Sequence, residues 1–288
     1  MPIVFAAIVP HGRTMIPGAS RGAGVSDIQL AMASLTRQLA EAAPDVLVLF
    51  TPHGLQLEGL LSIVVTARIG GGLGDSFNLP YLEAGIDVEH LGAVDFEVEC
   101  DRELAVQAVR TLRSAGAATV ACGFGAPDEL ATMPADWAIL IPLWFLLQQN
   151  QGLRVVVVNT ARSVSAADHV VAGEHVRAAA ETLGRRLAVV ASGDHGQTHR
   201  ADGPFGHDLA AVEYDRLVVG ALERGRLDAL LEPAVEDLAT EARADSWRPM
   251  LSLHGTLGIE DRWRGDVLAY VVPTYYGMLC ARIDVALD

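Results

Sequence analysis

The sequence predicts an α/β fold in which a central mixed sheet carries helices on both of its faces. Short apolar runs rich in β-branched residues alternate with longer stretches whose apolar residues recur at helical spacing, a pattern typical of a sheet covered by helices. The chain has 288 residues, of which 51% are hydrophobic, so it can bury a large core. No internal repeat and no long linker rich in proline, glycine or serine divides it, and we therefore expect one domain over residues 1–288.

Eight apolar runs have the length and composition of buried strands. In chain order they are Ile3–Val9, Asp45–Phe50, Leu61–Ala67, Ala118–Ala121, Ala138–Pro142, Arg154–Asn159, Leu187–Ser192 and Val267–Pro273. Five longer segments have helical periodicity. They are Ser26–Ala43, Asp101–Ser114, Ser165–Leu183, Asp208–Arg224 and Val235–Ser252. Ser26 and Ser165 stand where a serine hydroxyl caps the first free N–H groups of a helix.

The composition excludes several classes of function. Acidic residues outnumber basic ones by 36 to 21, and the net charge of −15 has the wrong sign for binding nucleic acid or an anionic membrane. All 21 basic residues are arginine, so Schiff-base and pyridoxal-phosphate chemistry, which need lysine, are excluded. The three cysteines are too far apart to suggest a disulfide framework, and we see no export signal or membrane anchor, so we expect a cytoplasmic protein with small-molecule partners.

Two histidines occur in the same local pattern. Val9-Pro10-His11-Gly12 and Thr51-Pro52-His53-Gly54 each follow directly on a predicted strand. The carboxyl ends of parallel strands line the crevice where α/β proteins bind ligands, and imidazole is the commonest metal ligand near neutral pH. A turn that merely tolerates histidine would explain one copy, but two copies at equivalent places favour a pair of metal ligands, His11 and His53.

A third group of histidines follows the predicted strand Leu187–Ser192. Asp194, His195 and His199 lie within six residues there. Two imidazoles and a carboxylate this close together favour a role in proton transfer. A self-contained zinc site made by His195, His199 and His207 is the alternative. The four-residue spacing of His195 and His199 brings two ligands together only on a helix, and the glycines and the proline of this segment disfavour a helix.

These motifs, together with the segment Glu241–Leu251, resemble the class III extradiol ring-cleavage dioxygenases. This is the family of the protocatechuate 4,5-dioxygenase β subunit, and the Memo-like proteins are its related non-enzymatic branch. The likeness runs from residue 2 to about residue 258. It implies an Fe(II) cofactor held by two strand-end histidines and a glutamate of the C-terminal third, here His11, His53 and Glu241, with Glu236 and Asp245 as open alternatives. Two histidines and one carboxylate leave coordination positions free for a diol and for O2.

The resemblance further implies a catechol- or 2-aminophenol-type substrate, O2 as co-substrate, and assembly as a homodimer, a larger homo-oligomer or with a second subunit. His195 or His199 would be the base, with His195 preferred because it is nearer the strand end. Two positions depart from the family pattern, since Gln197 and Trp137 stand where relatives have histidines. An accessory or Memo-like protein without ring cleavage, or a zinc hydrolase in the same pocket, therefore stays open.

Arginines near the motifs are candidates for binding a carboxylate of the substrate. They are Arg13, Arg162 and Arg200.

Overall fold

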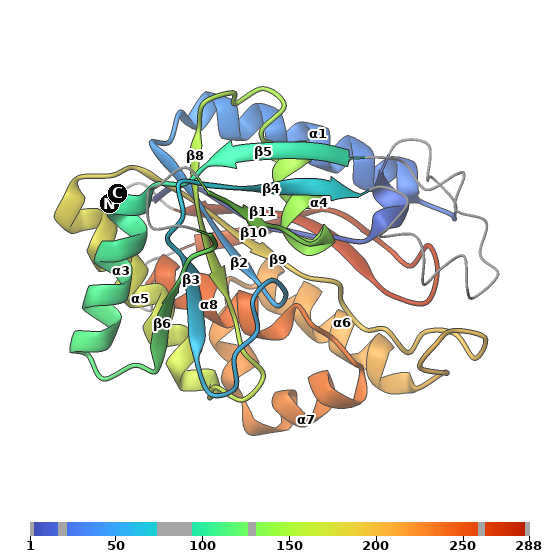
Figure 1. The fold of residues 1–288 in the computed structure, drawn as a ribbon. Coiled ribbons are helices and arrows are strands. Elements are labelled where there is room, and N and C mark those ends of the chain that lie inside the picture. Colours follow the sequence, from blue (N-terminus) through green and yellow to red (C-terminus); the bar gives the residue numbers. More distant parts are fainter. Residues whose placement is uncertain (1–2, 17–21, 74–93, 126–130, 259–262, 286–288) are drawn as a thin grey trace.

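The computed structural model describes residues 3–16, 22–73, 94–125, 131–258 and 263–285. Its centre is an eight-stranded mixed sheet in the order β10-β11-β1-β9-β2-β8-β3-β6, with helices on both faces, which confirms the predicted α/β fold (Figure 1). The strands are β1 (Ile3–Val9), β2 (Val46–Thr51), β3 (Leu61–Val64), β6 (Thr119–Cys122), β8 (Arg154–Asn159), β9 (Leu187–Ser192), β10 (Trp263–Val271) and β11 (Met278–Val285).

The four middle strands of this sheet are parallel. β9 pairs with β1 on one side and with β2 on the other, and β2 also pairs with β8. All residues of β2 and β9 are buried, as expected for strands covered on both faces. Because β9 lies between β1 and β2, the carboxyl ends of these three strands meet at one edge of the sheet.

Side chains of the sheet alternate between two apolar cores. Ala6, Val48 and Val156 face a core shared with α3, α5, α6, α7 and α8, whereas Phe5, Leu47 and Val155 face a core shared with α1 and α4. The helices are α1 (Val25–Ala42), α3 (Arg102–Ser114), α4 (Trp137–Leu146), α5 (Ala166–Leu183), α6 (Leu209–Glu223), α7 (Pro233–Glu241) and α8 (Trp247–Leu257), with short 3-10 turns η1 (Arg13–Met15) and η2 (Leu227–Leu231).

A second sheet of three strands packs on the α1 and α4 side, in the order β5-β4-β7. Its strands are β4 (Arg68–Leu73), β5 (Val94–Glu99) and β7 (Thr132–Pro134). The sequence did not predict this sheet, because β4 contains three glycines, β5 alternates with acidic residues and β7 is only three residues long.

The predicted strand Ala138–Pro142 is wrong, because this segment belongs to α4. Asp136 caps the helix, and its carboxylate accepts the Ala138 N–H at 3.1 Å. Eight of the ten residues of α4 are buried, so the helix is apolar all round and shows no helical periodicity that would distinguish it from a buried strand.

The predicted single helix Val235–Ser252 is also wrong, because α7 ends at Glu241 and α8 begins at Trp247. Between them Arg243 has a left-handed φ of 56°, which interrupts the helix. Pro249 lies in the first turn of α8, where a missing N–H costs no hydrogen bond.

The predicted cap at Ser165 is confirmed, since its hydroxyl accepts the Asp168 N–H. Ser26 lies inside α1, which begins at Val25 after a left-handed Gly24. Among the described helices, none is both long enough and apolar enough to cross a bilayer.

Candidate metal centre

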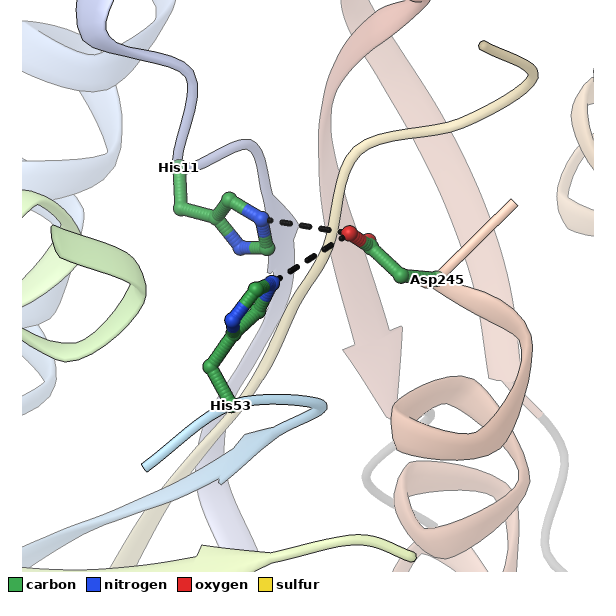
Figure 2. A group of neighbouring side chains, drawn as sticks. All are labelled: His11, His53 and Asp245. Carbon is green, nitrogen blue, oxygen red and sulfur yellow. Dashed lines mark ion pairs between the residues drawn. The ribbon is translucent and has the colours of Figure 1, made fainter. Parts of the chain in front are cut away.

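Two imidazoles and one carboxylate converge beyond the carboxyl ends of β1 and β2. The Nε2 atom of His11 lies 3.5 Å from Oδ2 of Asp245, and the Nε2 atom of His53 lies 3.6 Å from the same oxygen (Figure 2). One ligand atom from each of the three residues lies within 4.8 Å of the other two. The structure therefore brings together the two histidines that the strand-end motifs single out.

Glycines after the two histidines allow the chain to turn closely at this edge. A side chain at Gly12 would overlap the ring of Tyr276, and one at Gly54, which has a φ of 81°, would overlap the amide of Asn159. The Gly54 N–H donates to Oδ2 of Asp136 at 2.9 Å, which ties the His53 turn to the start of α4.

A hydrogen-bond relay fixes the ring of His11. Its Nδ1 atom lies 2.9 Å from the hydroxyl oxygen of Ser192, which donates to the main-chain carbonyl of Ala138 at 3.2 Å. That carbonyl has no helical partner, because the residue four positions later is Pro142, which has no N–H. Since Ser192 gives its one hydrogen to Ala138, its oxygen accepts the Nδ1–H of His11. With Nδ1 bound in this way, Nε2 is the ring nitrogen of His11 directed at Asp245, and once it loses its proton it offers a lone pair to a metal ion.

His53 forms the more open side of the group. Its side chain is 27% exposed, whereas that of His11 is 1% exposed. The two rings lie edge to face with centroids 5.1 Å apart, and the ring of Trp137 lies 4.5 Å from that of His53. Nδ1 of His53 faces Oδ2 of Asp136 at 3.7 Å, which favours a proton on Nδ1 and leaves Nε2 toward Asp245.

Two donors from the segment after β9 hold the carboxylate of Asp245. Its Oδ1 accepts the Asp194 N–H at 2.7 Å, and its Oδ2 accepts the side-chain amide of Gln197 at 3.2 Å. The Asp194 carboxylate in turn accepts the His11 N–H at 3.3 Å. The same short segment thus contacts both the His11 turn and the turn between α7 and α8.

The electrostatics of the group favour a positive charge at its centre. Burial lowers the pKa of His11, but the carboxylates of Asp194 and Asp245 outweigh burial and raise it to about 9. Burial raises the pKa of Asp245, but the facing imidazoles of His11 and His53 hold it well below its usual range. Burial raises the pKa of Asp194 to about 6 against the effect of His11. A proton or a metal cation is stabilised here by the same carboxylates.

Glu241, which the resemblance implies as the third ligand, lies elsewhere. It is the exposed last residue of α7, and Glu236 on the same helix is also exposed and pairs with Arg248 at 3.4 Å. The carboxylate beside the two imidazoles is that of Asp245, the other alternative that the sequence left open. The break between α7 and α8 is the physical reason, because it turns Asp245 back toward the strand ends.

His195 and His199 have different surroundings, although they are four residues apart. His195 is fully buried, and neither of its ring nitrogens has a hydrogen-bond partner among the described residues. Burial lowers the pKa of His195 despite the opposing charges of Asp215 and Asp245, so its imidazole is neutral at pH 7. Nε2 of His199 is bound to the Asp215 carboxylate at 2.8 Å, which also accepts the Tyr270 hydroxyl.

The alternative zinc site does not form within the described part of the chain. His207 is exposed, and the residues that converge as ligands are His11, His53 and Asp245. Of the candidate arginines, Arg13 is buried, Arg162 is exposed, and Arg200 is exposed and paired with Asp202 at 2.7 Å.

No sequence pattern indicates Ser192 and Pro142 as site residues, since both act through contacts between distant segments. A signal for Asp245 was available: Asp245-Ser246 precedes Trp247 and Pro249, and polar residues followed by a first-turn proline mark a helix start.

Comparisons with known proteins place the chain in a family. The curated Protein CA_C1420 of Clostridium acetobutylicum is 22% identical over 275 residues, which cover 91% of this chain and 53% of that protein, so the chain spans about half the length of this relative. The crystal structure of the uncharacterized protein JW3007 from Escherichia coli K12 has the same fold, with a TM-score of 0.58, 15% identity and coverage of 97% of this chain and 99% of that one. A family model described as the catalytic LigB subunit of aromatic ring-opening dioxygenase matches residues 6–278. Since this match spans most of the sequence and confirms the resemblance seen in the strand-end motifs, the chain belongs to the family of the catalytic LigB subunit of aromatic ring-opening dioxygenases.

Proposed function

We propose that this protein is a non-haem, Fe(II)-dependent extradiol dioxygenase that cleaves a catechol- or 2-aminophenol-type ring with O2. The observation that carries the proposal is the convergence of His11 Nε2, His53 Nε2 and Asp245 Oδ2. Two histidines and one carboxylate with open positions are the ligand set of non-haem Fe(II) oxygenases. Membership of the LigB family supports the same class of reaction.

The three residues fit a metal ion in distance as well as in chemistry. Two ligand atoms that are each about 2.1 Å from one ion are about 3.0 Å apart in octahedral geometry and about 3.4 Å apart in tetrahedral geometry. The observed separations from Asp245 Oδ2 are 3.5 and 3.6 Å, so each histidine–carboxylate pair is within a few tenths of an ångström of tetrahedral spacing, and all three ligand atoms lie within 4.8 Å of one another. When bound, Fe(II) supplies a redox-active centre with free positions for the two adjacent substrate oxygens and for O2.

His195 is the group best suited to take the substrate proton. A diol loses a proton when it binds a metal through oxygen, and a neutral imidazole within hydrogen-bond reach can accept it. His195 is neutral, buried and free at both ring nitrogens among the described residues, whereas His199 is held by Asp215. Trp137 lies against His53 and cannot accept a proton, and we therefore propose His195 as the base.

The test is oxygen uptake by the iron-loaded protein. Protein prepared without oxygen and loaded with Fe(II) is mixed with a panel of catechols and 2-aminophenols. We expect uptake of one O2 per ring, because both oxygen atoms enter the product as the ring bond beside the diol breaks, with a coloured ring-opened product. Iron bound in equal amount to protein, with no uptake across the panel, would refute the proposal.

A second candidate is a Memo-like or accessory protein that keeps the metal centre without cleaving rings. Trp137 and Gln197 favour it, because both stand where the resemblance implies histidines that handle protons. Metal binding without oxygen uptake, together with co-purification of a second subunit, would support this candidate. Zinc in the purified protein, with ester hydrolysis that Fe(II) does not restore, would instead indicate a hydrolase.

A further inference from the structure

We infer that Gln197 is a positioning residue that orients Asp245 as a metal ligand. The inference rests on the proposed metal centre, and it assigns a role to a residue that the reaction itself does not use.

Gln197 is bound twice to the turn that carries the carboxylate. Its main-chain N–H donates to the carbonyl of Ala242 at 2.7 Å, and its side-chain Nε2 donates to Oδ2 of Asp245 at 3.2 Å. The main chain of Asp194 binds the same turn, since its carbonyl accepts the N–H groups of Asp245 and Ser246 at 3.3 and 3.2 Å. Main-chain hydrogen bonds therefore hold the turn between α7 and α8 in position, whereas the side-chain amide of Gln197 binds only the carboxylate of Asp245.

The two donors bind different oxygens of Asp245, and only one of these oxygens faces the imidazoles. Oδ1 accepts the Asp194 N–H at 2.7 Å, a buried bond that fixes the rotation of the carboxylate. Oδ2 faces both imidazoles and has two lone pairs, of which the Gln197 amide uses one. The remaining lone pair points into the group formed with His11 and His53. Donors behind a ligand carboxylate fix its rotation and are worth about 10- to 100-fold in metal affinity.

Glutamine suits this task because its amide is neutral at every pH. Gln197 therefore adds no charge beside Asp245 at any pH. A histidine, which the resemblance implies at this position, offers an N–H at nearly the same reach from the main chain, but it also titrates near neutral pH. The substitution keeps the hydrogen bond and gives up the proton-transfer capacity.

The experiment compares metal affinities of three variants with that of the wild type at pH 8. Gln197→Met keeps the length and volume of the side chain without a donor, Gln197→Asn shortens it, and Gln197→His restores an N–H. Fe(II) and Zn(II) are titrated separately, without oxygen, against a competing chelator, and thermal unfolding of the metal-free proteins serves as the stability readout. Gln148→Met is the control, because Gln148 is an exposed glutamine beyond the C-terminal end of α4, away from Asp136 and the metal centre.

We expect Gln197→Met and Gln197→Asn to lose about 10- to 100-fold in affinity for both ions, and Gln197→His and the control to stay within about threefold of the wild type. Wild-type affinity in Gln197→Met would overturn the inference, because packing alone would then explain the residue. If Gln197→Met does not fold, the same comparison is decided by Gln197→Asn. A wild type that binds neither ion would refute the proposed metal centre itself, a result distinct from equal binding by wild type and variant.

Discussion

Replacing Ser192 by alanine removes one hydroxyl that serves two buried groups at once. The Nδ1–H of His11 loses its acceptor, and the carbonyl of Ala138, already without a helical partner because of Pro142, loses its donor. Ser192 and His11 are 0% and 1% exposed, so water does not replace the lost bonds. Each buried group left unsatisfied costs about 1–3 kcal/mol, and the metal-free variant should therefore lose about 2–4 kcal/mol of unfolding free energy, with some relaxation allowed.

The same change should weaken metal binding, because the ring of His11 is no longer held with its Nε2 lone pair toward Asp245. Loss of such a partner costs about 10- to 100-fold in affinity. Urea unfolding of the metal-free protein and a chelator-competition titration measure the two effects. Ser252→Ala is the matched control, since Ser252 is equally buried and its hydroxyl has no hydrogen-bond partner among the described residues. If Ser192→Ala loses no more stability and no more metal affinity than this control, the relay does not exist as described.

Three further predictions concern the proposed base His195, the stability of the protein in acid and the packing of α5 against α8. His195→Gln should lower the oxygen-uptake rate by about 10²- to 10⁴-fold while metal content stays unchanged, and a wild-type rate in the loaded variant would exclude His195 as the base. Burial lowers the pKa of His169 from 6.5 in the unfolded chain to about 4 in the folded protein. Protonation therefore favours the unfolded chain, and the unfolding free energy is unaffected by this group above pH 6.5 and decreases as the pH falls toward 4. The wild type should lose about 3 kcal/mol more than His169→Asn between pH 7 and pH 4 in urea unfolding, and parallel curves would contradict this. Gly173→Ala places a methyl group against the main chain of α8 and should lower the unfolding free energy by about 1–3 kcal/mol or more. Gly72→Ala, where the methyl group has room, is the control and should lower it by less than about 1 kcal/mol. Equal shifts in melting temperature for the two variants would show that α5 and α8 can separate freely.

The parts of the fold that were predictable are those in which local pattern and tertiary environment agree. β1, β8 and β9 have the bounds that their apolar composition predicts, and α5 begins after the serine that caps it. The strand-end position of His11 and His53 followed from the two Pro-His-Gly turns, because a parallel sheet brings such turns to one edge.

What could not be predicted depends on contacts between distant segments. α4 is buried on all sides, so its sequence has no period, and only its surroundings distinguish it from a strand. The position of Asp245, rather than Glu241, beside the two imidazoles depends on a five-residue interruption between α7 and α8, which the helical periodicity on both sides concealed. Ser192 and Gln197 make side-chain hydrogen bonds to segments far away in sequence, which no local pattern records.

The proline inside α4 weakens the helix but supports the hydrogen bonds that orient the ring of His11. Alanine is the better helix former at position 142, and an engineer who wished to make the protein more heat-resistant would choose that replacement first. The new N–H would compete with the hydroxyl of Ser192 for the carbonyl of Ala138, and a hydroxyl displaced from that carbonyl has the Nδ1 of His11 as its nearest acceptor. A firmer helix would then come with a histidine whose proton sits on the wrong nitrogen for holding an ion.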